Sequence, residues 1–279
     1  MSARPPAGMP TGAWTGGPSG DTALCVLAPN PSPMTLDGTN TWLLGAPGGA
    51  CVVVDPGPDD ATHLAAVRAA VEERGARVTA VWLTHGHADH SEGAATFARA
   101  AGVGVRALDP AHRLGAEGLA DGDGTDVEGA RVDVVATPGH TSDSLSFVLR
   151  PAGAAPALLT GDSVLGRGTT VVAFPDGTLA DYLASLRRLE ALVLAEGVGA
   201  VLPGHGPVLA APDVLPADVL AFYLAHRAER LDQVRAAVAA GATTAREVVE
   251  TVYADVPRAV WPAAELSVEA QLVYLRAGG

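Results

Sequence analysis

The sequence THGHADH, at residues 84–90, follows directly on the apolar run VTAVWL at residues 78–83. The run is rich in β-branched and aromatic residues and predicts a buried strand, while residues 91–101 repeat apolar side chains at three- and four-residue spacing and predict a helix. The polar segment therefore lies at the end of a strand, where side chains are held rigidly. Three imidazoles and one carboxylate at such a position indicate a metal site rather than a solvated turn.

The spacing inside this segment suggests two neighbouring cation sites. His85 and His87 alternate around one residue and can converge on one ion, while Asp89 and His90 turn towards a second. One short loop would then serve both ions.

Three further segments supply the missing ligands, and each follows an apolar strand pattern and is flanked by Gly or Pro. They are His140 in TPGHT, Asp162 in LLTGDS and His205 in LPGHG. The inventory then gives one site of His85, His87 and His140, a second site of Asp89, His90 and His205, and a bridging Asp162. Imidazole and carboxylate ligands suit two divalent ions, with Zn²⁺ preferred and Mn²⁺ or iron left open.

The chain pattern predicts an α/β domain followed by helices. Nine strands are expected at residues 23–28, 41–45, 50–55, 78–84, 103–108, 130–137, 144–150, 156–162 and 198–204, several of them antiparallel neighbours. Helices are expected at residues 61–74, 91–101, 179–195, 217–240, 244–253 and 263–276. We predict three parts: a flexible extension at 1–21, the α/β domain at 22–212 and a helical domain at 213–279.

The composition restricts the class of partner. The chain has 279 residues, 48% of them hydrophobic, with a net charge of −13 and 18 cationic residues that are all Arg. This balance disfavours nucleic acid and anionic membranes, but leaves room for a local anion pocket. We found neither a secretory signal nor an apolar stretch of the roughly 20 residues that a membrane helix needs, so a cytoplasmic protein with a small-molecule substrate is expected. Cys25 and Cys51 lie in apolar runs and are expected to be buried thiols.

The motif HGHADH, together with the downstream segments GHT, GDS and PGHG, resembles the metallo-β-lactamase superfamily over residues 30–210. This resemblance implies a four-layer αβ/βα sandwich in which the seven positions bind two metal ions. Asp55 in VVVDPG matches the first motif of that family, whose aspartate orients the metal loop. The alternative for Asp55 is an ordinary turn residue before Pro-Gly.

A carboxylate at the bridging position, Asp162, is similar to the glyoxalase, ribonuclease and phosphodiesterase branches of the superfamily and differs from true β-lactamases. The segments GDSVLGRGTTVV, PGHGPVL and YLAHRAER resemble the endoribonuclease-like branch of β-lactamase-like proteins. That branch carries a small winged-helix-like domain, and we expect a truncated, helical form of it here because the sequence stops at Gly279, soon after the third helix.

The expected function is hydrolysis of an ester, thioester or phosphodiester by a hydroxide that bridges two ions, with Asp89 orienting it and moving its proton. A mononuclear iron persulfide dioxygenase, a single-stranded RNA endoribonuclease and a non-catalytic binding protein remain alternatives, and a homodimer is left open. Candidate substrate contacts come from the loop at residues 29–42 and from Arg167, Thr169, Thr170 and Tyr182. His63 and His112 are expected at the surface, and His226 is expected to orient the helical tail.

Overall fold

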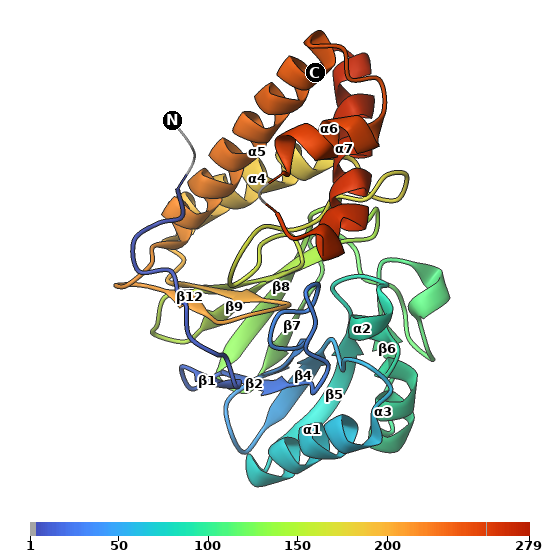
Figure 1. The fold of residues 1–279 in the computed structure, drawn as a ribbon. Coiled ribbons are helices and arrows are strands. Elements are labelled where there is room, and N and C mark those ends of the chain that lie inside the picture. The colour runs from blue at the N-terminus through green and yellow to red at the C-terminus, as the bar shows by residue number, and fades with distance from the viewer. Residues whose placement is uncertain (1–3, 255) are drawn as a thin grey trace.

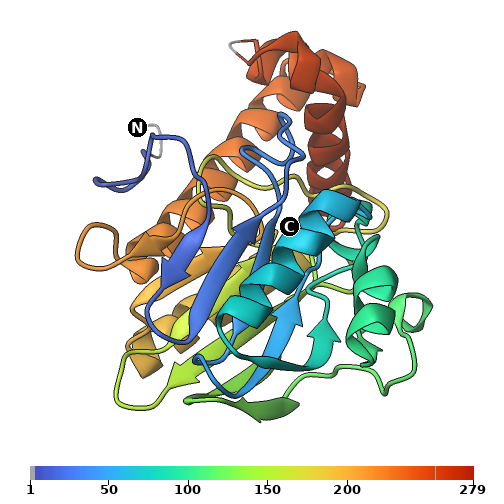
Figure 2. The ribbon, with the colours of Figure 1, turned by 90° about the horizontal axis from the view of Figure 1, so that it is seen from below.

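The structure is a computed structural model that describes residues 4–254 and 256–279. Two six-stranded sheets form its centre (Figures 1 and 2). The first sheet has the order β1-β2-β3-β4-β5-β6, with β4, β5 and β6 parallel and the other pairs antiparallel. Its strands are β1 (Gly17–Ser19), β2 (Ala23–Leu27), β3 (Asn40–Leu44), β4 (Ala50–Val54), β5 (Arg77–Trp82) and β6 (Val105–Arg106).

The second sheet has the order β12-β11-β10-β9-β8-β7, and only β10 and β11 pair in parallel. Its strands are β7 (Gly124–Val127), β8 (Ala130–Ala136), β9 (Leu145–Pro151), β10 (Ala157–Gly161), β11 (Ala200–Pro203) and β12 (Leu209–Ala210). All nine strands expected from the sequence are present, and three short ones, β1, β7 and β12, were not expected.

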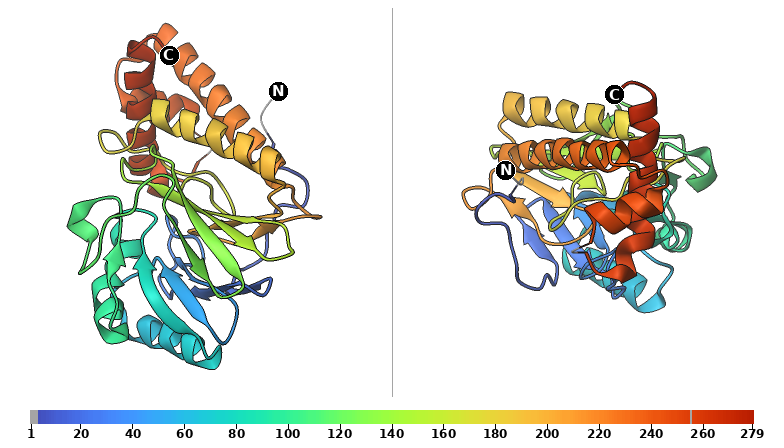
Figure 3. Two further views of the ribbon diagram at one scale, coloured as in Figure 1. Left: turned by 180° about the vertical axis from the view of Figure 1, so that it is seen from behind. Right: turned by 45° about the horizontal axis from the view of Figure 1, so that its top comes forward.

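Helices cover the outer faces of both sheets. The helices α1 (Ala61–Glu73) and α3 (Ala94–Ala101) pack on the first sheet, while α4 (Leu179–Glu196) lies across the second, as Figure 3 shows from behind. Trp82 and Phe147 meet between the sheets, with ring centroids 5.3 Å apart. The expected αβ/βα sandwich is therefore confirmed.

Three helices follow the second sheet: α5 (Pro216–Ala239), α6 (Ala245–Val252) and α7 (Trp261–Arg276). The side chain of Thr244 accepts the Glu247 amide while the Glu247 side chain accepts the amide of Thr244, which fixes the start of α6. Within the described residues no strand follows Ala210, so this region is helical, as expected. Short 3₁₀ turns lie at Pro110–His112 and Arg258–Val260.

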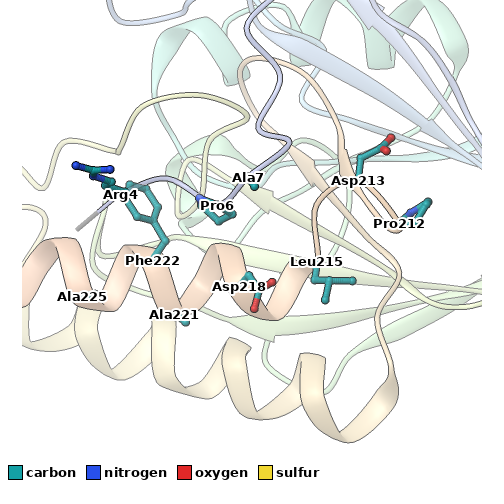
Figure 4. Close-up of a pocket in the computed structure, with 10 residues that line it drawn as sticks. All are labelled: Arg4, Pro6, Ala7, Pro212, Asp213, Leu215, Asp218, Ala221, Phe222 and Ala225. Atoms are coloured by element: carbon teal, nitrogen blue, oxygen red, sulfur yellow. The ribbon is translucent and has the colours of Figure 1, made fainter. Parts of the chain in front are cut away.

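Part of the segment for which the sequence predicted a flexible extension, at residues 14–19, contacts the first sheet. The strand β1 pairs with β2, and the indole Nε1 of Trp14 donates to Asn40 Oδ1 at 2.8 Å. Further upstream, the segment that includes Pro6 runs along α5, where Figure 4 shows a hollow between the two. The high Pro and Gly content of this segment predicted no regular structure, but Trp14 and the backbone of β1 hold it against the first sheet.

Candidate metal centre

The metal loop begins where β5 ends and runs into the short helix α2 (Ala88–Ser91). Asp55, which follows the neighbouring strand β4, holds this loop from behind. Its Oδ1 accepts the amide of Thr84 at 2.8 Å, and its Oδ2 accepts the hydroxyl of Thr84 at 2.6 Å and Nδ1 of His90 at 2.9 Å. Because Asp55 is only 1% exposed, these bonds are not weakened by water.

The first cluster consists of His85, His87 and His140, whose ring nitrogens converge. Nδ1 of His87 lies 3.0 Å from Nε2 of His85 and 3.1 Å from Nε2 of His140. These three side chains come from the loop after β5 and the loop after β8, and they form a group that could hold a metal ion.

The second cluster consists of Asp89, His90 and His205. Nε2 of His205 lies 3.2 Å from both Nε2 of His90 and Oδ2 of Asp89. These residues form another group that could hold a metal ion.

Asp162, in the turn after β10, lies between the two clusters. Its Oδ2 is 3.7 Å from Nε2 of His140 and 3.3 Å from Nε2 of His205, while Oδ1 is 3.5 Å from Nε2 of His90. Oδ1 is buried and has no hydrogen-bond partner among the described residues. A buried carboxylate oxygen without a donor, surrounded by imidazole nitrogens, fits a divalent cation.

Four of the histidines are bonded through Nδ1 on the side away from the centre. Nδ1 of His140 donates to the Val171 carbonyl at 2.7 Å, and Nδ1 of His205 donates to the Gly38 carbonyl at 3.1 Å. His90 donates to Asp55 in the same way, and His85 lies 3.0 Å from the Thr84 hydroxyl. These bonds favour the tautomer that presents Nε2 as a lone pair to a cation.

Burial and neighbouring charges together set the protonation of the cluster. Burial lowers the pKa of His85 and His140, which favours neutral imidazoles. Burial alone would raise the pKa of Asp89, but the hydrogen bond with His205 and the charge of His90 outweigh it and bring the pKa to about 2. For His205, burial lowers the pKa, but the charge of Asp162 outweighs it and raises the pKa to about 9.

The end of the loop at residues 29–42 contacts the second cluster. The Thr39 hydroxyl donates to Oδ2 of Asp89 at 3.3 Å, and Asn40 Nδ2 donates to the carbonyls of Pro203 and Gly206 on either side of His205. Sequence reasoning did not single out Thr39 or Asn40. The one available signal was that both lie in a polar segment directly before an apolar strand.

The four predicted substrate contacts, Arg167, Thr169, Thr170 and Tyr182, differ in their burial and in their hydrogen-bond partners. Arg167 is held by the Asp37 carboxylate and the Gly12 carbonyl, and Thr169 is partly exposed. Thr170 is buried, with its hydroxyl 3.5 Å from Nδ1 of His140. Tyr182 requires a correction: it lies on α4 with its side chain fully buried in the core, and its hydroxyl donates to the Ser163 carbonyl at 2.7 Å. A substrate has no access to that side chain.

His63 also corrects an expectation, because it is 2% exposed rather than at the surface. Its Nε2 lies 2.9 Å from the hydroxyl of Thr41, which donates to the backbone carbonyl of Asp55 at 2.7 Å. His112 is partly exposed and lies against Gly86 beside a cavity of about 170 Å³ that His87 also lines. His87 is the member of the first cluster that this cavity exposes.

The comparisons with known proteins agree with this geometry. Residues 34–205 match the metallo-beta-lactamase superfamily, and residues 244–279 match the beta-lactamase associated winged helix domain. The chain belongs to the metallo-beta-lactamase superfamily. It is 31% identical to the Beta-lactamase-like protein 2 homolog of Drosophila melanogaster over 281 residues, covering 92% of this chain and 89% of that protein.

Two further proteins are similar to the chain. The chain is 36% identical to the Atrochrysone carboxyl ACP thioesterase of Aspergillus fumigatus over 191 residues, which cover 66% of this chain and 56% of that protein. A metallo-beta-lactamase family protein of Thermus thermophilus shares the fold, with a TM-score of 0.74, 23% identity and coverage of 92% and 94% of the two chains. None of the described helices combines the length and apolar character needed to cross a membrane.

Proposed function

We propose that the chain is a dinuclear metal-dependent hydrolase of thioesters or related esters, with zinc as the preferred metal. The position of Asp162 carries this proposal, because its two oxygens face both clusters and one of them has no other partner among the described residues. In the proposed ligand set one ion would be held by His85, His87 and His140 and a second by Asp89, His90 and His205. Asp162 would serve both ions. The 36% identity to a named thioesterase favours a thioester over a phosphodiester.

Two divalent ions in these clusters would supply a hydroxide nucleophile near neutral pH and polarise the scissile carbonyl. Asp89 is the more accessible of the two central carboxylates, with a side chain 30% exposed against 11% for Asp162. Its Oδ2 is oriented by Thr39 and His205. We assign Asp89 the task of orienting the attacking group and passing its proton to the leaving thiolate, so that water and thioester give a carboxylic acid and a thiol.

The test uses zinc-loaded protein and the acetyl thioester of N-acetylcysteamine, with the released thiol measured colorimetrically. Asp162→Ala should lose metal and abolish turnover, because two cations at short separation repel one another without a bridging anion. Asp126→Ala, a change at a carboxylate that is 84% exposed in its pair with Arg131, is the matched control and should behave like wild type. Full activity in Asp162→Ala would contradict the proposal.

Two further assays on the same purified protein distinguish the hydrolase from a dioxygenase and from a ribonuclease. One iron per chain after reconstitution, with oxygen consumed on a persulfide, would replace the hydrolase by a dioxygenase. Cleavage of single-stranded RNA that vanishes in Asp162→Ala would identify a ribonuclease, against the expectation from the net charge of −13.

A further inference from the structure

A cavity of about 270 Å³ lies between the C-terminal helices and the loop that carries Thr170. Thr170 and Val171 line it, and the same two residues contact Nδ1 of His140, through the Thr170 hydroxyl at 3.5 Å and the Val171 carbonyl at 2.7 Å. Two residues of the cavity lining therefore contact a member of the first histidine cluster directly.

Arg227, on α5, is the most informative residue of this cavity. Its side chain is buried although it carries a permanent charge, with the residue only 5% exposed. One guanidinium nitrogen donates to the Thr170 carbonyl, and the guanidinium carbon lies 5.0 Å from the centre of the Tyr182 ring. Nε has no hydrogen-bond partner among the described residues. A buried N–H without an acceptor costs about 1–3 kcal/mol, so this donor favours a bound acceptor, and the charge favours an anionic one.

Arg230, on the same helix, adds to the positive potential, and His226 adds an uncharged ring beside it. Arg230 lies 4.6 Å over the Tyr253 ring and uses Nη1 for Gln233 and the Val252 carbonyl, at 3.0 Å each. Nδ1 of His226 is buried and has no partner among the described residues. Burial lowers the pKa of His226, and the charges of Arg227 and Arg230 lower it further, to about 4, although Glu229 opposes them.

Several of the other lining residues are apolar. Val256, Val260 and Ala263 face the cavity from the helical domain, and Met34 faces it from the loop at residues 29–42. An occupant with a charged group and a short aliphatic part matches this lining. The volume suits such a group and is far too small for a segment of RNA.

We propose that this cavity binds the carboxylate or phosphate monoester group of an anionic acyl substrate, with Arg227 and Arg230 as its partners. The inference rests on the proposed hydrolase, because it specifies which thioesters that centre would prefer. A carboxylate would belong to the acyl part of the substrate, and a phosphate would belong to the thiol part. The local positive potential gives a protein of net charge −13 a place to hold one small anion.

The kinetic test compares three substrates of the zinc-loaded enzyme. Acetyl-N-acetylcysteamine is neutral, succinyl-N-acetylcysteamine carries a carboxylate on the acyl side, and S-acetyl-4′-phosphopantetheine carries a phosphate on the thiol side. The variant is Arg230→Gln, because Arg227 also holds the Thr170 carbonyl and its loss could disturb the fold. Arg235→Gln is the control, since Arg235 lies on the same helix, outside the cavity lining, and pairs with Asp232.

In Arg230→Gln, the KM for one of the two anionic substrates should rise about ten-fold relative to the KM for the neutral one, as expected for loss of a charge-assisted contact. The anionic substrate that responds identifies the carboxylate or the phosphate as the bound group. In Arg235→Gln the ratio should stay at the wild-type value. An unchanged ratio in Arg230→Gln overturns the inference.

A binding measurement separates this inference from the proposed function. Calorimetric titration of inorganic phosphate and of succinate into zinc-loaded wild type and Arg230→Gln compares the affinities without turnover. If wild type hydrolyses none of the three thioesters, the proposed function fails, while weaker binding of either anion to Arg230→Gln still supports the cavity. Equal affinities in both proteins would show that the cavity does not bind these anions.

Discussion

The carboxylate of Asp55 lies 2.9 Å from Nδ1 of His90 and holds the neighbouring Thr84 through two hydrogen bonds. Asp55 adopts a positive φ of 49°, a backbone conformation that costs a non-glycine residue free energy. The three hydrogen bonds accepted by its side chain offset that cost. A single carboxylate thus fixes both the end of β5 and the orientation of one proposed metal ligand.

Replacing Asp55 with Asn should weaken metal binding more than it weakens the fold. The amide retains the shape but loses the charge that favours Nδ1–H on His90, so the affinity of the second cluster for zinc should fall by about 10–100-fold. Competition with a chromophoric chelator measures this. Asp59→Asn, at an exposed position in the same turn, is the control. An affinity equal to wild type would leave Asp55 as an ordinary turn residue.

His63 is expected to stabilise the turn at Asp55 indirectly, through its hydrogen bond to Thr41. Nε2 of His63 must donate to the Thr41 hydroxyl, because that hydroxyl already donates to the Asp55 carbonyl. His63→Leu removes the donor and should lower the free energy of unfolding by about 1–3 kcal/mol, measured by urea denaturation. His63→Gln can still donate and should lose less. Equal losses in the two variants would show that packing, rather than the hydrogen bond, is what His63 contributes.

The sequence was most informative where the signal is local. His85, His87, Asp89 and His90 lie within six residues of one another, so their spacing alone predicted a shared loop, and the structure brings their side chains together. The long strands were found in the same way, because each has its own apolar pattern. The strands β1 and β7, with the sequences GPS and GTDV, contain no apolar run, and β12 is only two residues long.

The residues behind the proposed ligands could not be found from local patterns. Thr39 is 50 positions from Asp89, and their contact arises only when β3 and β5 join the first sheet. Gly38 is 167 positions from His205, and their contact arises only when the two sheets pack. For Tyr182 the helix was predicted correctly, but the direction of the side chain was not. The apolar spacing located α4 correctly, but it did not show that this residue faces the core rather than the metal centre.

Gly204 should tolerate no side chain, because it lies between two proposed ligands. A Cβ at this position would lie 2.5 Å from Oδ1 of Asp162 and 2.8 Å from Cε1 of His90. Gly204→Ala should displace Asp162 and lower turnover by about 10² or more, since small misplacements of a reacting centre are costly. Gly12→Ala, where a Cβ meets open space, is the control. Metal analysis of Gly204→Ala should show less than the wild-type content, and a full complement with normal turnover would contradict the proposed ligand geometry.

Acidification should destabilise the helical domain through His226. Its pKa is lowered from 6.5 to about 4 in the folded protein, chiefly by burial, so between these values the unfolded chain binds a proton that the folded chain does not. The stabilisation is therefore fully present above pH 6.5 and is lost as the pH falls towards 4. Because the ring is partly exposed, we expect a loss of about 1–2 kcal/mol rather than the full value of the shift.

The measurement is urea denaturation of zinc-loaded wild type and His226→Gln at pH 7.5 and at pH 5.0. Protonation of the proposed metal ligands destabilises both proteins at the lower pH, so the difference between wild type and variant isolates His226. The variant should lose about 1–2 kcal/mol less than wild type on acidification, because Gln has no proton to take up. Parallel losses in the two proteins would show that His226 is not held neutral by its position beside Arg227 and Arg230.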